Sequence, residues 1–148
     1  MSLSEEFQGR GIDAVMIRIV ARTGTGMVKS LVRAILCRAA RLEQQPDLQE
    51  YNPVIVCSPI WAGHLTPEFL GFVKGLRAVE GKQFYSLHCC FGDTAGALGR
   101  ASELLQQKGV EVLGTGYITT SDLLERAKLP VFVKGVVDVC IDRSDQVT

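Results

Sequence analysis

The chain has 148 residues, of which 47% are hydrophobic and 22% are charged, a balance typical of one globular domain. Sixteen Lys and Arg residues offset sixteen Asp and Glu residues, so the formal net charge is zero. The chain as a whole is therefore not a basic nucleic-acid-binding protein, and no nucleic-acid partner is expected. No apolar run approaches the roughly 18 residues that a membrane-spanning helix needs, so no membrane partner is expected.

We expect one domain at residues 14–142. Residues 1–13 form an N-terminal extension that is polar up to residue 11 and lacks the apolar core of a signal peptide; its first three residues are compatible with an expression scar. Residues 143–148 are expected to be a C-terminal tail. The five cysteines show no C-x-x-C spacing, so we interpret them as the reduced thiols of a cytoplasmic protein.

The first predicted element is a strand at 14–20, because this run is apolar and rich in β-branched residues. A glycine-rich turn at 21–26 follows, and then apolar residues recur at helical spacing. The apolar face of this predicted helix is formed by Met27, Leu31, Ala34 and Ile35. Strand, turn and helix make the first half of a βαβ unit. Residues 39–43 are a candidate for a short second strand, and the polar stretch 44–52 is expected to be a loop.

The middle of the chain begins with a strong strand at 54–58, followed by a predicted loop at 59–66. Thr66 followed by Pro67 predicts the start of a helix, because a hydroxyl can cap the first turn and proline is tolerated within it. The next strand is expected at 83–89 and the next loop at 90–96.

The last elements are a helix at 95–108, which Gly109 ends, and a strand at 110–118. Residues 130–142 are favoured as a helix, although their many valines leave a strand open. Strands that alternate with helices predict an α/β fold with a parallel sheet covered on both faces. In such folds a ligand binds at the carboxyl ends of the strands.

The turn at 22–26 offers the clearest chemistry at that edge. Backbone N–H groups before a helix N-terminus attract anions, phosphate above all. Thr23 and Thr25 add hydroxyl donors, and Arg22 adds positive charge. An ordinary turn without a ligand remains the alternative. The spacing excludes a dinucleotide fingerprint, because Lys29 stands where a small residue is needed, and it excludes a Walker loop, because Val28 replaces the required glycine.

The other two loops carry one aromatic candidate each. Trp61, the only tryptophan, lies beside Gly63 and is placed to stack on a flat ring system. Packing against its own sheet or against another subunit remains the alternative, and a homodimer stays open. Phe91 is a candidate second aromatic wall, and Gly92 allows the backbone to approach a ligand closely.

Together these loops resemble the flavodoxin family. Residues 21–26, ARTGTG, occupy the place of the family's phosphate loop, Ser/Thr-x-Thr-Gly-x-Thr. Residues 48–67, LQEYNPVIVCSPIWAGHLTP, look like its third strand and flavin loop, with Asn52 in the place of an aspartate. Residues 81–116 are similar to its fourth strand, loop, helix and fifth strand. The resemblance covers about 14–118 and is strongest in 48–67.

The resemblance implies a flavodoxin-like three-layer α/β/α sandwich with a five-stranded parallel sheet and a site for flavin mononucleotide (FMN). The implied phosphate ligands are Arg22, Thr23, Gly24, Thr25 and Gly26. The implied ring contacts on the second loop are Pro59, Ile60, Trp61, Ala62 and Gly63. The implied contacts with the other ring face or the pyrimidine edge are Cys90, Phe91, Gly92 and Asp93.

The implied function is electron transfer to a redox partner protein, or a small reductase of the quinone or nitro type that uses a small-molecule acceptor. The flavin carries the chemistry in either case, so no side chain is assigned a catalytic role. The alternative is an interaction module that has lost FMN, because Ala21 and Gly26 replace two hydroxyls of the family's phosphate loop. Each missing hydrogen bond to the phosphate would cost about 1.5–3 kcal/mol.

Three further patterns are weaker. His64 and His88 are interpreted as a loop and a strand histidine rather than as metal ligands, because no spacing supplies the three or four ligands that a metal needs. Cys89 and Cys90 end a strand and are either a redox-active pair or a buried and a loop thiol. A basic stretch is interpreted as a solvated face, with a phosphate-rich partner as the alternative; it consists of Lys29, Arg33, Arg38 and Arg41.

Overall fold

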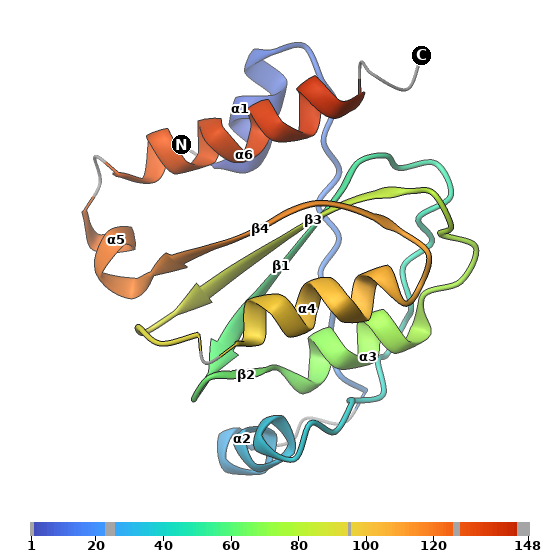
Figure 1. Cartoon of the computed structure of the whole chain (residues 1–148), viewed down its shortest axis with the longest axis vertical. Helices are drawn as coiled ribbons and strands as arrows, with labels where there is room; N and C mark the ends of the chain where they lie inside the picture. The colour runs from blue at the N-terminus through green and yellow to red at the C-terminus, as the bar shows by residue number, and fades with distance from the viewer. Residues whose placement is uncertain (1, 23–25, 95, 126–127, 145–148) are drawn as a thin grey trace.

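A computed structural model of the chain describes residues 2–22, 26–94, 96–125 and 128–144 (Figure 1). Its elements are, in chain order, α1 (Leu3–Gly9), α2 (Met27–Ile35), β1 (Val54–Trp61), β2 (His64–Leu65), α3 (Pro67–Gly75), β3 (Gln83–Cys90), α4 (Ala97–Gln106), β4 (Glu111–Thr119), α5 (Thr120–Leu124) and α6 (Lys128–Ser144). The predicted α/β class is confirmed. No helix among the described residues is long and apolar enough to cross a membrane.

The strands form one open sheet in the order β2-β1-β3-β4. β1 pairs in parallel with β3, from Val54 opposite Phe84 to Pro59 opposite Cys89, and β3 pairs in parallel with β4. β2 is a two-residue strand that returns antiparallel to the end of β1. Because β1, β3 and β4 run in the same direction, their carboxyl ends meet at one edge of the sheet.

Apolar cores lie on both sides of this sheet. On one side α3 and α4 pack on the strands through side chains that are at most 4% exposed, among them Val56, Phe69, Phe72, Phe84 and Leu105. On the other side α6 and α1 enclose a smaller cluster around Phe7, Leu113 and Val137. Figure 1 shows α1 and α6 together at the top, across the sheet from α3 and α4.

The strand predicted at 14–20 is not confirmed: this segment belongs to no strand of the described sheet. Its side chains are largely exposed, with Met16 at 81%, because among the described residues no ladder pairs it with β1. It instead reaches residues 41–43, where Glu43 N–H donates to the Val20 carbonyl at 2.9 Å. The candidate strand at 39–43 is thus reduced to a single antiparallel bridge between Ala21 and Leu42. The described sheet therefore has four strands rather than five.

The helix predicted after the glycine-rich turn is confirmed as α2, but most of its apolar face is exposed. Only Ser30 and Ala34 are buried along it, whereas Met27 is 83% and Val28 76% exposed. α2 contacts α3 and β2, and Figure 1 shows it below the main body of the sheet and helices. The helical spacing was therefore informative about the element but not about its packing.

The loop predicted at 59–66 is also wrong. β1 continues to Trp61, and a two-residue turn at Ala62 and Gly63 leads directly into β2. Both turn residues have positive φ, 48° and 76°, as a type I′ hairpin turn requires. Two helices were not predicted, α1 and α5, and each begins with a capping box, at Ser2 and at Thr119.

The remaining elements are confirmed. α3 begins as predicted, with the Thr66 hydroxyl accepting a hydrogen bond from Phe69 N–H at 3.4 Å and Pro67 in the first turn. β3, α4 and β4 lie within one or two residues of their predicted ranges, and residue 95 lies outside the described residues. α6 decides between the two alternatives for the C-terminal segment in favour of a helix.

Two glycines let the irregular segment after α2 lie directly on α3. A Cβ atom at Gly71 would collide with the Ala40 carbonyl oxygen, and one at Gly75 would collide with the Gln45 side chain. In return Ala40 N–H donates to the Pro67 carbonyl at 2.8 Å, and the Gln45 amide donates to the Phe72 carbonyl at 3.0 Å. The close approach thus allows two hydrogen bonds between this segment and α3.

Gly71→Ala should lower the free energy of unfolding by about 1–3 kcal/mol, because the Ala40 carbonyl belongs to the backbone and has little room to move. The matched control is Gly99→Ala on α4, where a Cβ atom meets nothing within 4 Å. That substitution should stabilise the protein by about 0.5–1 kcal/mol through helix propensity. Urea denaturation of both variants measures the difference; equal effects would contradict the packing described for α3.

Candidate functional site

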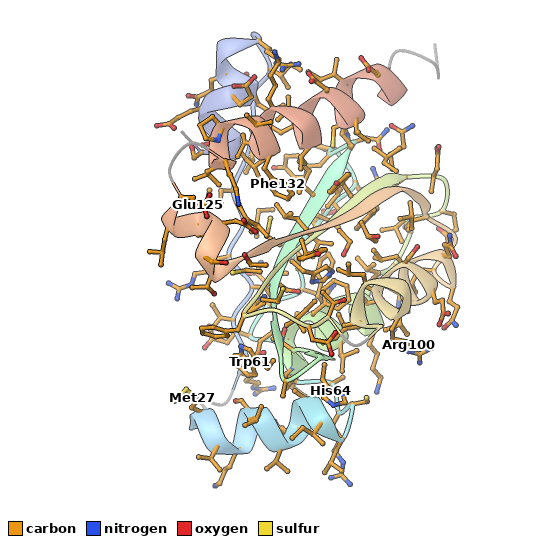
Figure 2. All side chains as sticks on the ribbon, turned by 60° about the vertical axis from the view of Figure 1, so that its left-hand side comes forward. Met27, Trp61, His64, Arg100, Glu125 and Phe132 are labelled. Atoms are coloured by element: carbon orange, nitrogen blue, oxygen red, sulfur yellow. The ribbon has the colours of Figure 1, made fainter. Side chains whose placement is uncertain are left out.

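The carboxyl ends of β1 and β3 bring two aromatic residues to the same level of one edge. The last register pair of these strands is Pro59 with Cys89, so Trp61 and Phe91 each stand two residues beyond it. Phe91 is 90% exposed and Trp61 is half-buried. Figure 2 shows Trp61 at the lower end of the sheet, with α2 below it. An exposed aromatic beside a half-buried one offers a surface for a flat ring.

The structure brings the two predicted ring-contact segments together, but not every side chain faces outward. Ile60 is 3% exposed and Cys90 is 2% exposed, and both belong to the core beside α3 and α4. Any contact from them to a ligand would have to come from the backbone. Pro59, Ala62, Gly92 and Asp93 are exposed and Gly63 is half-buried in the hairpin turn.

The predicted phosphate loop is only partly described, because Thr23, Gly24 and Thr25 lie outside the described residues. Arg22 is exposed, and its N–H donates to the Arg41 carbonyl at 2.7 Å. Gly26 is the N-cap of α2, with no side-chain cap and no acidic residue in the first turn. The first N–H groups of α2 thus face no carboxylate of their own helix, which favours an external anion.

A buried polar cluster lies just behind this edge, between β1 and β3. His88, 1% exposed, bonds through Nδ1 to the Ser58 hydroxyl at 3.0 Å and through Nε2 to the Ser86 hydroxyl at 2.8 Å. The Phe69 ring packs edge-on against the imidazole, with centroids 5.4 Å apart. Burial lowers the pKa of His88 to about 4, so the ring is neutral at pH 7, with one nitrogen donating and the other accepting.

This cluster fixes the register of the two strands that carry the aromatic residues. The prediction that His88 lies in a strand is confirmed, whereas neither of its serine partners was predicted. The signal was present, since residues 84, 86 and 88 alternate onto one face and two of them are polar. No group of residues among those described could hold a metal ion.

The two adjacent cysteines are free thiols at the end of β3. Burial, followed by the neighbouring Cys90, raises the pKa of the half-buried Cys89 thiol, which reduces its thiolate fraction. Cys90 is the last residue of β3 rather than a loop thiol, and its S–H donates to the Gly92 carbonyl at 3.4 Å. His64, expected in a loop, lies in β2.

The end of β4 places an ion pair near the same edge. Thr119 caps α5, and hydrogen bonds from Thr119 and then Lys128 lower the pKa of Asp122 to about 2. The Lys128 ammonium lies 2.9 Å from this carboxylate. Thr120, which follows the capping residue Thr119, donates a hydrogen bond from its hydroxyl to the Cys90 carbonyl at 3.4 Å. α5 is thereby tied to the end of β3.

Comparisons with known proteins identify no relative: no protein-family model, no curated protein and no solved structure matches the chain. The flavodoxin resemblance therefore stays a hypothesis that depends on the motifs of residues 14–118. The site is characterised by its own geometry, in which two aromatic residues, a tight hairpin turn and a neutral buried histidine meet at one end of the sheet.

The pKa of His88 predicts a specific dependence of stability on pH. Between about 6.5, the pKa of an unfolded histidine, and about 4, the unfolded chain binds one more proton than the folded chain. Stability should therefore be complete above this window and fall by about 3 kcal/mol as the pH drops through it. Urea denaturation at half-unit pH steps measures the slope.

The matched variant is His88→Gln, which retains hydrogen-bonding groups but does not titrate. It should lower stability at pH 7 and flatten the slope between pH 4.5 and 6.5. The same slope in both proteins would show that another group titrates there and that His88 is not the buried neutral residue described.

Proposed function

We propose that this chain binds FMN at the edge where β1 and β3 end, and uses it for electron transfer or as a small reductase. The observation that carries the proposal is the placement of Trp61 and Phe91 at the same level of two neighbouring parallel strands, in the segments that resemble the flavin loops of flavodoxins. At 90% exposure, the Phe91 ring is accessible to a planar ligand that approaches this edge.

Several features of the described residues support a site for the ring of FMN. Trp61 and Phe91 supply aromatic surface, and the Ala62–Gly63 turn presents backbone groups beside them. Glycine at position 63 accepts its positive φ of 76° without strain and leaves room for a ring edge. The phosphate is assigned to Arg22, Gly26 and the residues between them, with the uncapped N-terminus of α2 as the source of N–H donors.

In this proposal FMN supplies the capacity to accept and release electrons, and the protein supplies position and shielding. Trp61 holds the orientation of the ring, and the hairpin turn fixes where its polar edge lies. The acceptor is a redox partner protein or a small molecule that approaches the exposed side of the ring. No side chain of the site is required to transfer a proton.

The proposal includes the finer fold, a five-stranded sheet in three layers, with 14–20 pairing with the free edge of β1. Two contacts support it. Ala14 packs against the cluster beneath α6, and Ile19 packs against the cluster beneath α3 and α4. The segment thus passes both cores in an extended conformation, and its exposed apolar side chains would gain burial in a completed sheet.

A second candidate, an interaction module without flavin, is favoured by the exposed apolar face of α2. Five apolar side chains of this helix and its C-cap are each at least 48% exposed: Met27, Val28, Val32, Ile35 and Leu36. Contiguous apolar surface of this kind commonly marks a contact with another protein. The titrations below distinguish the two candidates, because this one predicts that FMN does not bind.

FMN should quench the fluorescence of Trp61 to a large degree, since stacking brings the two ring systems into contact. Because Trp61 is the only tryptophan, the signal reports this one position. Phe91→Ser should weaken binding at least a few-fold, whereas the control Val131→Ser on the exposed face of α6 should not change it. Unchanged fluorescence at saturating FMN would remove Trp61 from the site.

Riboflavin, which lacks the phosphate, should bind at least about tenfold more weakly than FMN, because hydrogen bonds to a charged group contribute about 1.5–3 kcal/mol each. Arg22→Gln should weaken FMN but not riboflavin, and Arg18→Gln serves as the matched control on the exposed segment before it. Isothermal titration calorimetry measures all four affinities. Equal affinity for both flavins would contradict the assignment of the phosphate to residues 22–26.

A further inference from the structure

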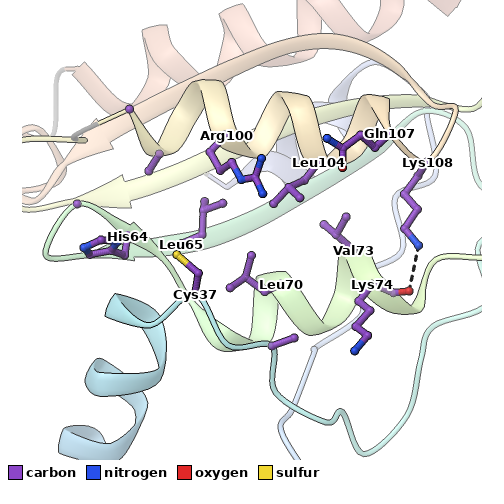
Figure 3. Close-up of a pocket in the computed structure, with 14 residues that line it drawn as sticks. Cys37, His64, Leu65, Leu70, Val73, Lys74, Arg100, Leu104, Gln107 and Lys108 are labelled. Atoms are coloured by element: carbon purple, nitrogen blue, oxygen red, sulfur yellow. Dashed lines mark hydrogen bonds between the residues drawn. The ribbon is translucent and has the colours of Figure 1, made fainter.

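A groove lies between α3 and α4, and residues of both helices line it. Its volume is about 430 Å³, and β2 together with the segment after α2 closes one end. The side chains that line its floor are apolar and are Leu65, Leu70, Val73, Ala97 and Leu104. Figure 3 shows Leu65 of β2, Leu70 and Val73 of α3 and Leu104 of α4 pointing toward the groove between the two helices. The volume lies in the range of small-molecule sites.

The rim of this groove carries positive charge only. Lys74, Arg100 and Lys108 line it, and no acidic residue is among the described residues that do so. In Figure 3 the Arg100 guanidinium reaches from α4 over the apolar side chains, and Lys108 crosses toward α3. The Lys108 ammonium donates to the Lys74 carbonyl at 3.0 Å, which closes the far end of the groove with a positive charge.

The positive charge of Arg100 is only weakly compensated. Its guanidinium lies 3.3 Å from the Glu103 carboxylate on the same helix, and both side chains are more than half exposed. Exposed pairs of this kind contribute little energy and exchange readily with other partners. A carboxylate, sulfonate or phosphate can accept two parallel hydrogen bonds from a guanidinium, which the single contact with Glu103 does not use.

From this combination we infer that the groove binds a small amphiphilic anion, with its apolar body on the floor and its acidic group between Arg100 and Lys108. The apolar lining excludes a highly polar ligand such as a free sugar, and the three cations exclude a cationic amphiphile by repulsion. The inference does not rest on the proposed flavin site, since Gly63 alone of the residues predicted for that site lines this groove.

The probe for the test is 8-anilinonaphthalene-1-sulfonate, an aromatic body with one sulfonate, and its uncharged analogue is N-phenyl-1-naphthylamine. The anion should bind about tenfold more tightly than the neutral compound, and Arg100→Gln should remove most of that difference. Lys134→Gln on α6 removes one exposed charge from the other side of the sheet and should leave both affinities unchanged. Calorimetry gives the affinities, and circular dichroism confirms that each variant is folded.

Two cysteines locate the probe. Cys37 lines the groove and is exposed, whereas Cys57 is exposed on β1 and does not line it. Saturating probe should slow the alkylation of Cys37 by iodoacetamide several-fold and leave the rate at Cys57 unchanged, as measured by peptide mass spectrometry. Because Cys37 follows α2 closely, Val28→Ser tests whether the probe instead covers that helix, and this variant should keep the protection.

Equal affinities for the charged and the neutral probe would overturn the inference, as would equal protection of both cysteines. Loss of protection in Val28→Ser, with full protection in Arg100→Gln, would place the probe on α2 and would also overturn it. Competition by FMN for the probe would show one shared site instead of a separate groove.

Discussion

The parallel pairing of β1 with β3 is the constraint on which the rest of the structure depends. Six consecutive register pairs join the strands, and His88 bonds to a serine on each of them. These bonds matter because a buried imidazole without hydrogen-bond partners would lower the free energy of unfolding. The same register carries Trp61 and Phe91 to one level of the sheet, so the candidate flavin site is a consequence of the pairing.

Some of the apolar surface of this fold has no cover among the described residues. On the side of β1 that faces away from β3, the only ladder partner among the described residues is the two-residue strand β2. In addition, α2 exposes most of its apolar face. Both features lie beside the candidate site, since α2 contacts β2 and begins directly after the predicted phosphate loop. Contact with FMN and burial by a partner protein are the two physical outcomes that separate the proposed functions.

Sequence patterns predicted those elements whose signals are local. Thr66 and Pro67 start α3 because capping requires only neighbouring residues, and the alternation in β3 follows from its own side chains. The strand at 14–20 is not confirmed, because a strand needs a ladder partner and local sequence does not reveal one. The groove was invisible for the same reason, since Lys74, Arg100 and Lys108 meet only when α3 and α4 pack side by side. The capping boxes at Ser2 and Thr119 were readable and were overlooked.

The central claim is that a flavin occupies the edge formed by β1 and β3. Hydrogen–deuterium exchange with and without saturating FMN tests it most directly, because each backbone amide reports its own protection. The account predicts slower exchange at 22–26, 59–63 and 90–93, with no change in α6 between residues 131 and 141. Unchanged exchange at 59–63 and 90–93, or protection confined to α3 and α4, would contradict the account.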